Sequence, residues 1–302
     1  MRPFKFTTVL LILTTSLFSC GMAFINNEAV TGYDLSKPDK SVVLPDILYE
    51  VSGLTHIDAT TFACIQDEKG ILFFYDTEKN AIKRQCTFYT DGDYEDIARV
   101  GDTMFVLQSD GTLFEIKPFT SDNFRLNTYN TGIPANDNEG LCYDRDNNRL
   151  LIACKGKIGK GSEYHDKRAI YGFDLQTKQL TDEPVFDFDL EKIKAFAIKK
   201  HLNLPTKTRK NKGKPITEPL IKFRTSAIGI HPLTKQLFIL SATDHLLFIT
   251  DRNGNMEHIE QLNPAIFNKA EGITFYENGD MLISNEGQNK KPTVLRFNYK
   301  KQ

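Results

Sequence analysis

Short hydrophobic segments separated by turn residues recur along most of the chain. Examples are TMFVLQ, TLFEIK, QLFILS, HLLFIT and DMLISN, which are bounded by segments such as SDG, DRNGN and ENG. Runs of four to eight residues rich in β-branched and aromatic side chains, bounded by Gly, Asn and Asp, are typical of β-strands. The pattern therefore predicts an all-β fold.

A short phrase also recurs, made of a polar residue, then a small residue or Asp, then an aliphatic residue. Its copies begin at Ser52, Glu95, Glu139, Ser226 and Glu271, which lie 43, 44, 87 and 45 positions apart. A period near 44 residues is typical of a propeller blade built from four antiparallel strands. We therefore expect a β-propeller in which each copy opens one blade.

The 87-residue interval holds either a further blade or an insertion before blade four. Residues 190–203 carry apolar side chains at helical spacing, and the following PTKTRKNKGKP is basic, bounded by proline and without strand character. We interpret this interval as a helical and basic insertion, which gives five blades, with six blades as the alternative. The fifth blade has only three strands before the chain ends, and residues 41–46 can supply its missing outer strand, which would close the ring without exposed edges.

The first twenty residues resemble a bacterial export signal. Arg2 and Lys5 precede a short apolar stretch, Val9 to Phe18, that is too short to span a bilayer comfortably. The segment ends in Leu-Phe-Ser-Cys at Cys20, which is similar to the lipobox of lipoproteins, whereas an ordinary signal peptide is the alternative. We therefore predict a lipoprotein signal peptide at 1–20, a tether and linker at 21–40 and the propeller domain at 41–302. A lipidated Cys20 would hold the protein at a membrane of the bacterial cell envelope, facing the periplasm or the cell surface.

Charge and cysteine content narrow the class of protein. The chain has 38 Lys and Arg against 39 Asp and Glu, and this balance argues against a nucleic-acid partner, which would require a basic excess. No C-x-x-C pair is present among Cys20, Cys64, Cys86, Cys142 and Cys154, so zinc-knuckle and thioredoxin-like chemistry lack support. We expect the last four to pack as small apolar residues, with a bond between Cys142 and Cys154 as the alternative.

The repeated phrase predicts a site on the propeller axis. The first strand of each blade lines the central channel, so Glu95, Glu139 and Glu271 should meet at its mouth. Crowded carboxylates repel one another, and a divalent cation relieves that repulsion; ligands that are all oxygen favour calcium. The alternative is that these glutamates only line a wet channel or cap backbone amides. The predicted ligand-binding rim around them consists of Ser52, Asp67, Asp110, Ser226, Asp244 and Glu286.

Five segments of the chain together resemble the SdiA-regulated family of bacterial envelope proteins. They are YEVSGLTHID, YEDIARVGDTMFVLQSDGTLFEI, NEGLCYDRDNNRLLIACKG, SAIGIHPLTKQLFILSATDHLLFITD and KAEGITFYENGDMLISNEG. The resemblance implies a five-bladed propeller distantly similar to NHL-repeat propellers, with a calcium site that includes Glu95, Glu139 and Glu271. Ser52 and Ser226 depart from the acidic pattern.

Two basic segments have no assigned role. The loop after Cys154 carries Lys155, Lys157 and Lys160, which is a solvated loop or a cradle for an anionic group, and it does not match the phosphate-loop motif. The run from Lys207 to Lys214 is an exposed insertion or a contact for acidic lipid headgroups.

These features favour a binding module over an enzyme. Neither G-x-S-x-G nor H-E-x-x-H occurs, so no nucleophile–base or zinc-protease motif is visible. We expect an envelope propeller that binds calcium and a protein or envelope ligand at its channel mouth. The alternatives are a calcium-dependent hydrolase similar to propeller lactonases or phytase-like esterases, and a purely structural spacer.

Overall fold

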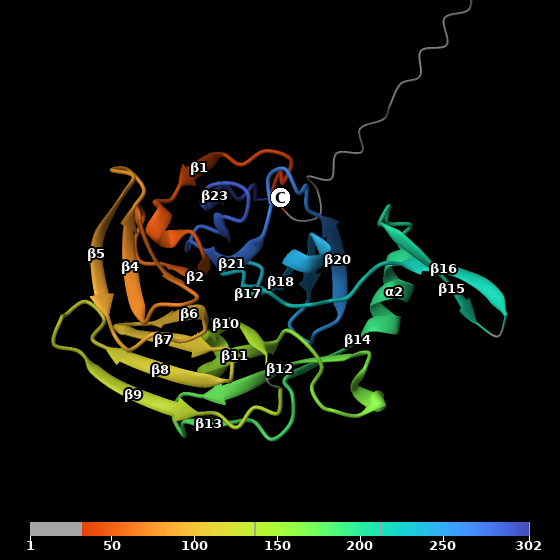
Figure 1. Ribbon diagram of the computed structural model, residues 1–302, viewed down its shortest axis with the longest axis horizontal. Helices are drawn as coiled ribbons and strands as arrows, with labels where there is room; N and C mark the ends of the chain where they lie inside the picture. Colours follow the sequence, from red (N-terminus) through yellow and green to blue (C-terminus); the bar gives the residue numbers. More distant parts are fainter. Residues whose placement is uncertain (1–31, 136, 212, 302) are drawn as a thin grey trace, which may run out of the picture.

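Five antiparallel sheets surround a common axis in the computed structural model, which describes residues 32–135, 137–211 and 213–301 (Figure 1). The inner strands contact one another in cyclic order, so the described residues form a closed five-bladed β-propeller, as predicted. The alternative with six blades is wrong. The predicted export signal, Cys20 and the start of the tether lie outside the described residues.

Each blade is a sheet of four main strands that runs from the axis outward. Blade one contains β2 (Val51–His56), β3 (Thr61–Gln66), β4 (Ile71–Asp76) and β5 (Ala81–Thr87), and blade two contains β6 (Tyr94–Val100), β7 (Thr103–Gln108), β8 (Thr112–Lys117) and β9 (Arg125–Asn130). Blade three contains β10 (Asn138–Asp144), β11 (Arg149–Cys154) and β12 (Lys167–Asp174), whose outer edge pairs with both β13 (Gln179–Leu180) and β14 (Phe186–Asp189). Blade four contains β17 (Ala227–Ile230), β18 (Leu237–Ser241), β19 (Leu246–Thr250) and β20 (Met256–Gln261).

Blade five joins the two ends of the chain. Its inner strands are β21 (Ala270–Phe275), β22 (Met281–Asn285) and β23 (Thr293–Phe297), and its outer strand is β1 (Lys40–Val43). In the antiparallel pairing, Ser41 lies opposite Leu295 and Val42 opposite Val294. The predicted closure by residues 41–46 is therefore confirmed, and no blade is left with an incomplete edge.

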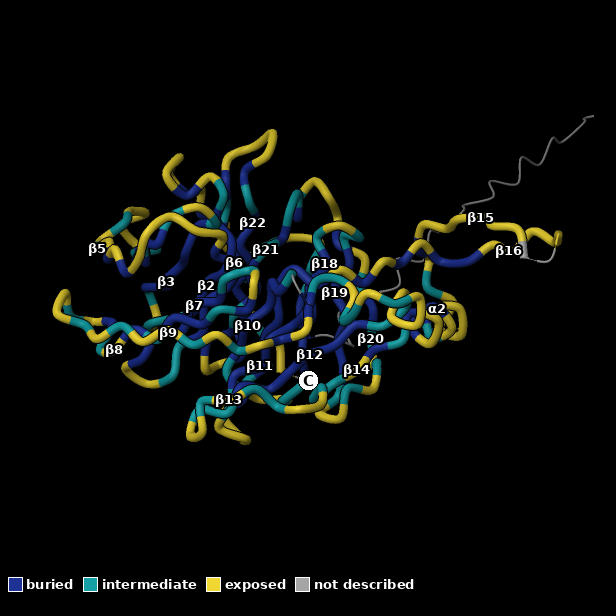
Figure 2. The backbone as a smooth tube through the Cα atoms, turned by 60° about the horizontal axis from the view of Figure 1, so that its bottom comes forward, coloured by how far each residue is buried: buried dark blue, intermediate teal, exposed yellow. Residues whose placement is uncertain are grey.

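The core lies between the blades. Inner and middle strands are buried along most of their length, whereas the outer strands alternate between buried and exposed residues (Figure 2). Apolar clusters join the facing sides of neighbouring blades; one of them packs Phe74 of blade one against Phe119, in the connection between β8 and β9 of blade two. Burial of these faces holds the disc together, since each blade covers the apolar face of the next.

The insertion before blade four consists of a helix and a hairpin. Helix α2 (Leu190–Lys199) begins at the N-cap residue Asp189, whose carboxylate accepts hydrogen bonds from the backbone of Glu191 and Lys192, and its buried Ile193 joins the core. The expected absence of strands after it is wrong: β15 (Thr206–Asn211) and β16 (Lys214–Pro219) form a hairpin that projects from the disc (Figure 1). Because β15 and β16 pair only with each other, their sequences do not show the alternation of apolar and polar residues that predicts a strand. No helix in the described ranges is long and apolar enough to cross a bilayer.

The turns and the cysteines agree with the sequence. Asp76, Asp174 and Asp251 each accept hydrogen bonds from backbone amides two to four residues later, which shapes the turn after the third strand. Cys142 lies opposite Leu151 and Cys154 opposite Asn138, so these two thiols do not face each other. All four described cysteines are buried and form no disulfide; they are Cys64, Cys86, Cys142 and Cys154.

Candidate functional site

The inner strands of four blades carry a β-bulge at the repeated phrase. In β6, Tyr94 pairs with Gln108 and Asp96 with Leu107, so Glu95 has no partner in the ladder. The same shift leaves Glu139 unpaired in β10 and Glu271 unpaired in β21, and in β2 it falls between Val51 and Leu54. A bulge re-aims the side chain of its extra residue. The repeated phrase therefore places each predicted glutamate on a bulge where its strand begins.

Two of these glutamates meet a third carboxylate. One carboxylate oxygen from each of Glu95, Asp137 and Glu139 lies within 4.8 Å of the other two. Asp137 precedes β10 by one residue and was not predicted. We call this group of three carboxylates the acidic cluster. Among the described residues, these three side chains lie close enough together to hold a metal ion.

The predicted third glutamate lies in the same electrostatic environment. Burial is the main reason why the pKa of Glu95 is raised, and the negative charge of Glu271 adds to that rise. The positive charge of Lys155 opposes the rise in the pKa of both glutamates. Glu271 also lies 3.3 Å from the ammonium of Lys269, measured from its nearer carboxylate oxygen. The structure therefore brings all three predicted glutamates to one mouth of the channel.

Burial strongly perturbs the acids at this mouth. Burial, reinforced by the charge of Asp93, raises the pKa of Glu95 to about 8, although Lys155 opposes the change. Burial also raises the pKa of Glu271 against the effect of Lys269, and it raises the pKa of Asp67 to about 6 with the help of Glu50. Such shifts mean that ionising these acids together is costly and that an added cation would stabilise them.

Two lysines already balance part of this charge. Lys155 makes an ion pair with Glu139, and Lys269 makes one with Glu286. Neither lysine was predicted to have this role, because Lys155 was considered only as part of an anion cradle. The acids at the mouth outnumber these two cations; they are Glu50, Asp67, Asp93, Glu95, Asp137, Glu139, Glu271 and Glu286.

Four buried oxygen atoms at this mouth have no hydrogen-bond partner among the described residues. They belong to the side chains of Asp67, Asn138, Glu139 and Asn285. Asn138 begins the inner strand β10 opposite Cys154, and Asn285 ends the second strand β22 opposite Ala270, so both lie at the mouth end of their blades. A buried oxygen without a partner costs roughly 1–3 kcal/mol, so a bound cation or water is needed to satisfy this group.

The rim residues have different roles. Ser52 donates a hydrogen bond to the carbonyl of Tyr94 (2.9 Å) and Ser226 to that of Ala270 (2.7 Å), so both hydroxyls join one blade to the next. Asp110 is exposed and accepts a hydrogen bond from the backbone of Thr112 in the turn after β7. Asp244 accepts hydrogen bonds from the backbone amides of Lys222 and Phe223. Of the predicted rim, Asp67 and Glu286 remain as acids beside the cluster.

Comparison with known proteins identifies the family. A family model described as SdiA-regulated matches residues 30–290. The chain belongs to the SdiA-regulated family. Among curated proteins, no match to this SdiA-regulated chain is found.

One solved structure shows that this SdiA-regulated protein shares its fold with a distant protein. Glutaminyl cyclase of Myxococcus xanthus has a TM-score of 0.55 at 13% identity, covering 86% of this chain and 94% of the cyclase. Streptogramin B lyase has a TM-score of 0.47 at 12% identity, covering 86% of this chain and 97% of the lyase. At 13% identity, the similarity to the cyclase is evidence of a common fold alone.

Proposed function

We propose that this protein is a recognition propeller of the bacterial cell envelope that binds calcium at the acidic cluster. In this proposal Glu95, Asp137 and Glu139 hold the cation, and the surrounding acids of the mouth bind a protein or envelope component. The anchor is a lipid on Cys20, which keeps the disc at the membrane surface.

The observation that carries the calcium proposal is the second carboxylate oxygen of Glu139. Glu139 is 4% exposed, one of its oxygens accepts from Lys155, and the other is buried without a hydrogen-bond partner in the described chain. An ionised carboxylate needs its remaining lone pairs satisfied when it is buried. A divalent cation shared with Glu95 and Asp137 would satisfy this oxygen and reduce the repulsion that raises the pKa of Glu95.

The ligand atoms fit calcium in their chemistry. All three ligands of the cluster offer carboxylate oxygens, and neither imidazole nor thiolate belongs to the group. Calcium takes six to eight oxygen ligands in a flexible geometry, so the three side chains leave positions for water or for an oxygen of the bound partner. The cation would therefore supply a direct contact to an acidic or carbonyl group of the ligand.

Calcium addition followed by thermal unfolding tests this proposal. At a calcium concentration 100 times the Kd, binding to the folded state alone adds about 2.7 kcal/mol. For a protein of this size we expect the Tm to rise by roughly 5–10 °C and to return when a chelator is added. An unchanged Tm at millimolar calcium would contradict a calcium site.

Two variants give opposite expected results. Glu139→Gln removes a ligand and should weaken calcium binding at least about tenfold, because a neutral amide replaces an ionised oxygen. Lys155→Gln removes the cation that competes for Glu139 and should strengthen calcium binding. Isothermal titration measures both, with Glu183→Gln, an exposed acid far along blade three, as the matched control. Equal affinities in all three proteins would remove the cluster from the proposal.

Lipid anchoring needs its own measurement. Expression of the full chain in a bacterial host with labelled palmitate should label the protein and direct it to the membrane fraction. Cys20→Ser should abolish both the label and the membrane association. Labelling that persists in Cys20→Ser would place the anchor elsewhere.

A second candidate function is calcium-dependent hydrolysis. It is favoured by the position of Glu95, whose carboxyl group lies beside Asp137 and Glu139 and can exchange a proton with a substrate bound there. In this case the cation would polarise a carbonyl or phosphoryl oxygen, and Glu95 would act as general acid or base. The expected result is calcium-dependent turnover of a lactone, ester or phosphoester that is lost in Glu95→Gln. No turnover across such a panel would leave recognition as the function.

A further inference from the structure

A cavity lies at the opposite end of the channel from the acidic cluster. Its volume is about 1040 Å³, and it is lined where the inner strands end, by residues 54–56, 97–101, 141–147, 229–230 and 273–275. All five inner strands begin at the acidic mouth and end at this cavity, so the two sites are on opposite faces of the disc. We call it the basal cavity.

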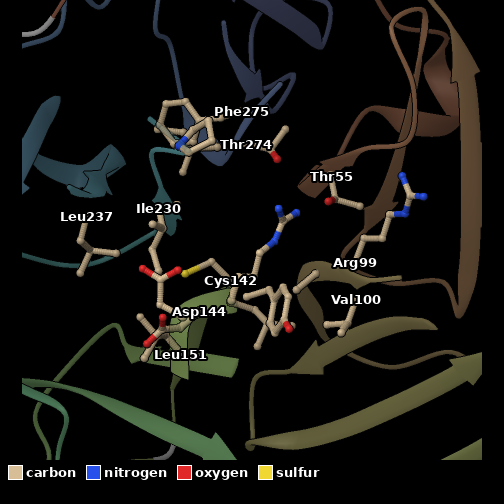
Figure 3. Close-up of a pocket in the computed structure, with 18 of the residues that line it drawn as sticks. Thr55, Arg99, Val100, Cys142, Asp144, Leu151, Ile230, Leu237, Thr274 and Phe275 are labelled. Atoms are coloured by element: carbon tan, nitrogen blue, oxygen red, sulfur yellow. The ribbon is translucent and has the colours of Figure 1, made fainter. Parts of the chain in front are cut away.

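The floor of the basal cavity is apolar. Cys142, Ile230 and Phe275 line the cavity and come from three different blades (Figure 3). Phe275 packs edge-on against His231, and Cys142 belongs to the apolar cluster between blades three and four. The cavity therefore combines apolar side chains with polar groups, as small-molecule sites do.

Polar groups surround this floor and are open to a ligand. The hydroxyls of Thr55 and Thr274 both line the cavity, and neither has a hydrogen bond within the described chain. Four acids also line it, but each is engaged: Asp144 with Arg149 (2.9 Å), Glu277 with Arg145 (3.1 Å), Asp146 with Arg252, and Asp251 with the amides of its own turn. The cations are five, one more than the acids: Arg99, Arg145, Arg149, Lys235 and Arg252.

Arg99 is the cation that these acids leave over. Its guanidinium donates to the backbone carbonyls of Ile57 (2.6 Å) and Gly101 (3.0 Å), and it has no ion pair with a described carboxylate. The two carbonyls use two of its five N–H groups, and its guanidinium also lies over the ring of Phe119, 5.6 Å from the ring centroid, so three contacts fix its position at the cavity wall. A guanidinium held in place with N–H groups to spare is suited to bind a carboxylate, sulfonate or phosphate.

We infer that the basal cavity binds a small amphipathic anion, whose charged group meets Arg99 and whose apolar body covers Cys142, Ile230 and Phe275. The threonine hydroxyls accept or donate hydrogen bonds at the boundary between the two parts. The exposed ion pair between Arg145 and Glu277 links blades three and five across the cavity entrance. Exposed pairs contribute only about 0–1 kcal/mol, so this contact opens readily to admit a ligand.

A fluorescent amphipathic anion, 1-anilinonaphthalene-8-sulfonate, tests the inference directly. The chain has no tryptophan, so energy transfer from indole does not complicate its signal. We expect saturable binding of one probe per folded chain, with displacement by decanoate but much weaker displacement by decanol or decyltrimethylammonium. Displacement that does not depend on the charge of the competitor would overturn the anion preference without any variant.

Variants at Arg99 locate the site. Arg99→Gln should raise the Kd of the probe roughly tenfold, because one charge-assisted contact is lost. Arg99→Lys keeps the charge without the fork and should fall between Arg99→Gln and the parent. Arg125→Gln, at an exposed arginine on the outer strand β9, is the matched control and should bind as the parent does. Equal probe affinity in Arg99→Gln and Arg125→Gln, with unchanged circular dichroism, would overturn the inference.

The outcome is independent of the calcium proposal. Calcium, chelator and Glu139→Gln act on the opposite face and should leave probe binding unchanged. If calcium does not bind but probe binding depends on charge, the inference about the basal cavity is supported and the calcium proposal fails. If calcium binds but probe binding does not depend on charge, only the proposal about the acidic cluster is supported.

Discussion

Replacing Glu95 by Gln should stabilise the metal-free protein and remove its response to calcium. Glu95 carries a carboxyl group whose pKa is raised from an ordinary 4.5 to about 8, mainly by burial and then by Asp93. At pH 7 to 8 this carboxyl group is ionised in the unfolded chain. In the folded chain it is either largely protonated, or it is ionised at a cost in the free energy of folding. Gln has nearly the same shape and no charge to bury, so it avoids this cost.

The size of the effect follows from linkage. Each pKa unit is worth about 1.4 kcal/mol, so the displacement from 4.5 to pH 7 has an upper bound of about 3 kcal/mol. Partial exposure and relaxation reduce it, and we expect about 1–2 kcal/mol, or roughly 2–6 °C in Tm. The folded pKa lies above the unfolded one, so the unfolded state binds fewer protons, and stability falls as the pH rises from about 4.5 to about 8. The advantage of Glu95→Gln should therefore be small at pH 5 and largest at pH 8.

Thermal unfolding in chelator at pH 5 and pH 8, followed by the same series in calcium, measures both effects. Glu115→Gln is the matched control. Glu115 is half-buried, and although burial raises its pKa, hydrogen bonds from Tyr129 (2.5 Å) and Lys178 (3.0 Å) outweigh that effect and lower it. This control should lose stability at pH 8 and keep its calcium response. A Glu95→Gln protein that melts at or below the parent at pH 8 in chelator would refute the reasoning.

Three further predictions concern the disc itself. Deleting the chain up to Val43 removes β1 and with it the buried side chains of Tyr33 and Val42, so we expect a loss of about 3–5 kcal/mol, seen as an early, broadened transition in circular dichroism. An unaltered melt would show that closure of blade five is unimportant. Ser226→Ala removes the hydrogen bond to the carbonyl of Ala270 and should cost about 1–2 kcal/mol in denaturant unfolding, whereas a neutral result would mean that water replaces the hydroxyl. A thiol reagent should react slowly with the folded domain. After unfolding without reductant, it should react with four additional thiols, and a smaller number would reveal a disulfide among Cys64, Cys86, Cys142 and Cys154.

The architecture could be predicted because the same phrase opens every blade. Its spacing gave the length of a blade, the helical and basic composition of the 87-residue interval favoured five blades over six, and the equal position of Glu95, Glu139 and Glu271 in the phrase placed them at one mouth. The hairpin β15–β16 was missed because strands that pair only with each other need no alternation of apolar residues. An alternation of apolar residues in the sequence indicates that a strand contacts the core, and the hairpin has little contact with the core.

The composition of the site was only partly predictable. Asp137 lies in the connection before β10, and Lys155 follows β11, so their approach to Glu139 depends on the blade geometry and not on a shared phrase. The serines at Ser52 and Ser226 were placed at the mouth by analogy, whereas each hydroxyl bonds to the next blade. The basal cavity gave no signal, because ordinary residues at the strand ends line it.

The bulges have a consequence for how this scaffold can change. Glu95, Glu139 and Glu271 stand outside the backbone ladder, so the sheets do not depend on the identity of the side chain at these positions. Binding chemistry at the mouth can therefore vary with little effect on folding. Glu95→His and Glu139→His, beside Asp137, would replace two oxygen ligands of the cluster by imidazole, the ligand that suits zinc and copper, on an unchanged scaffold.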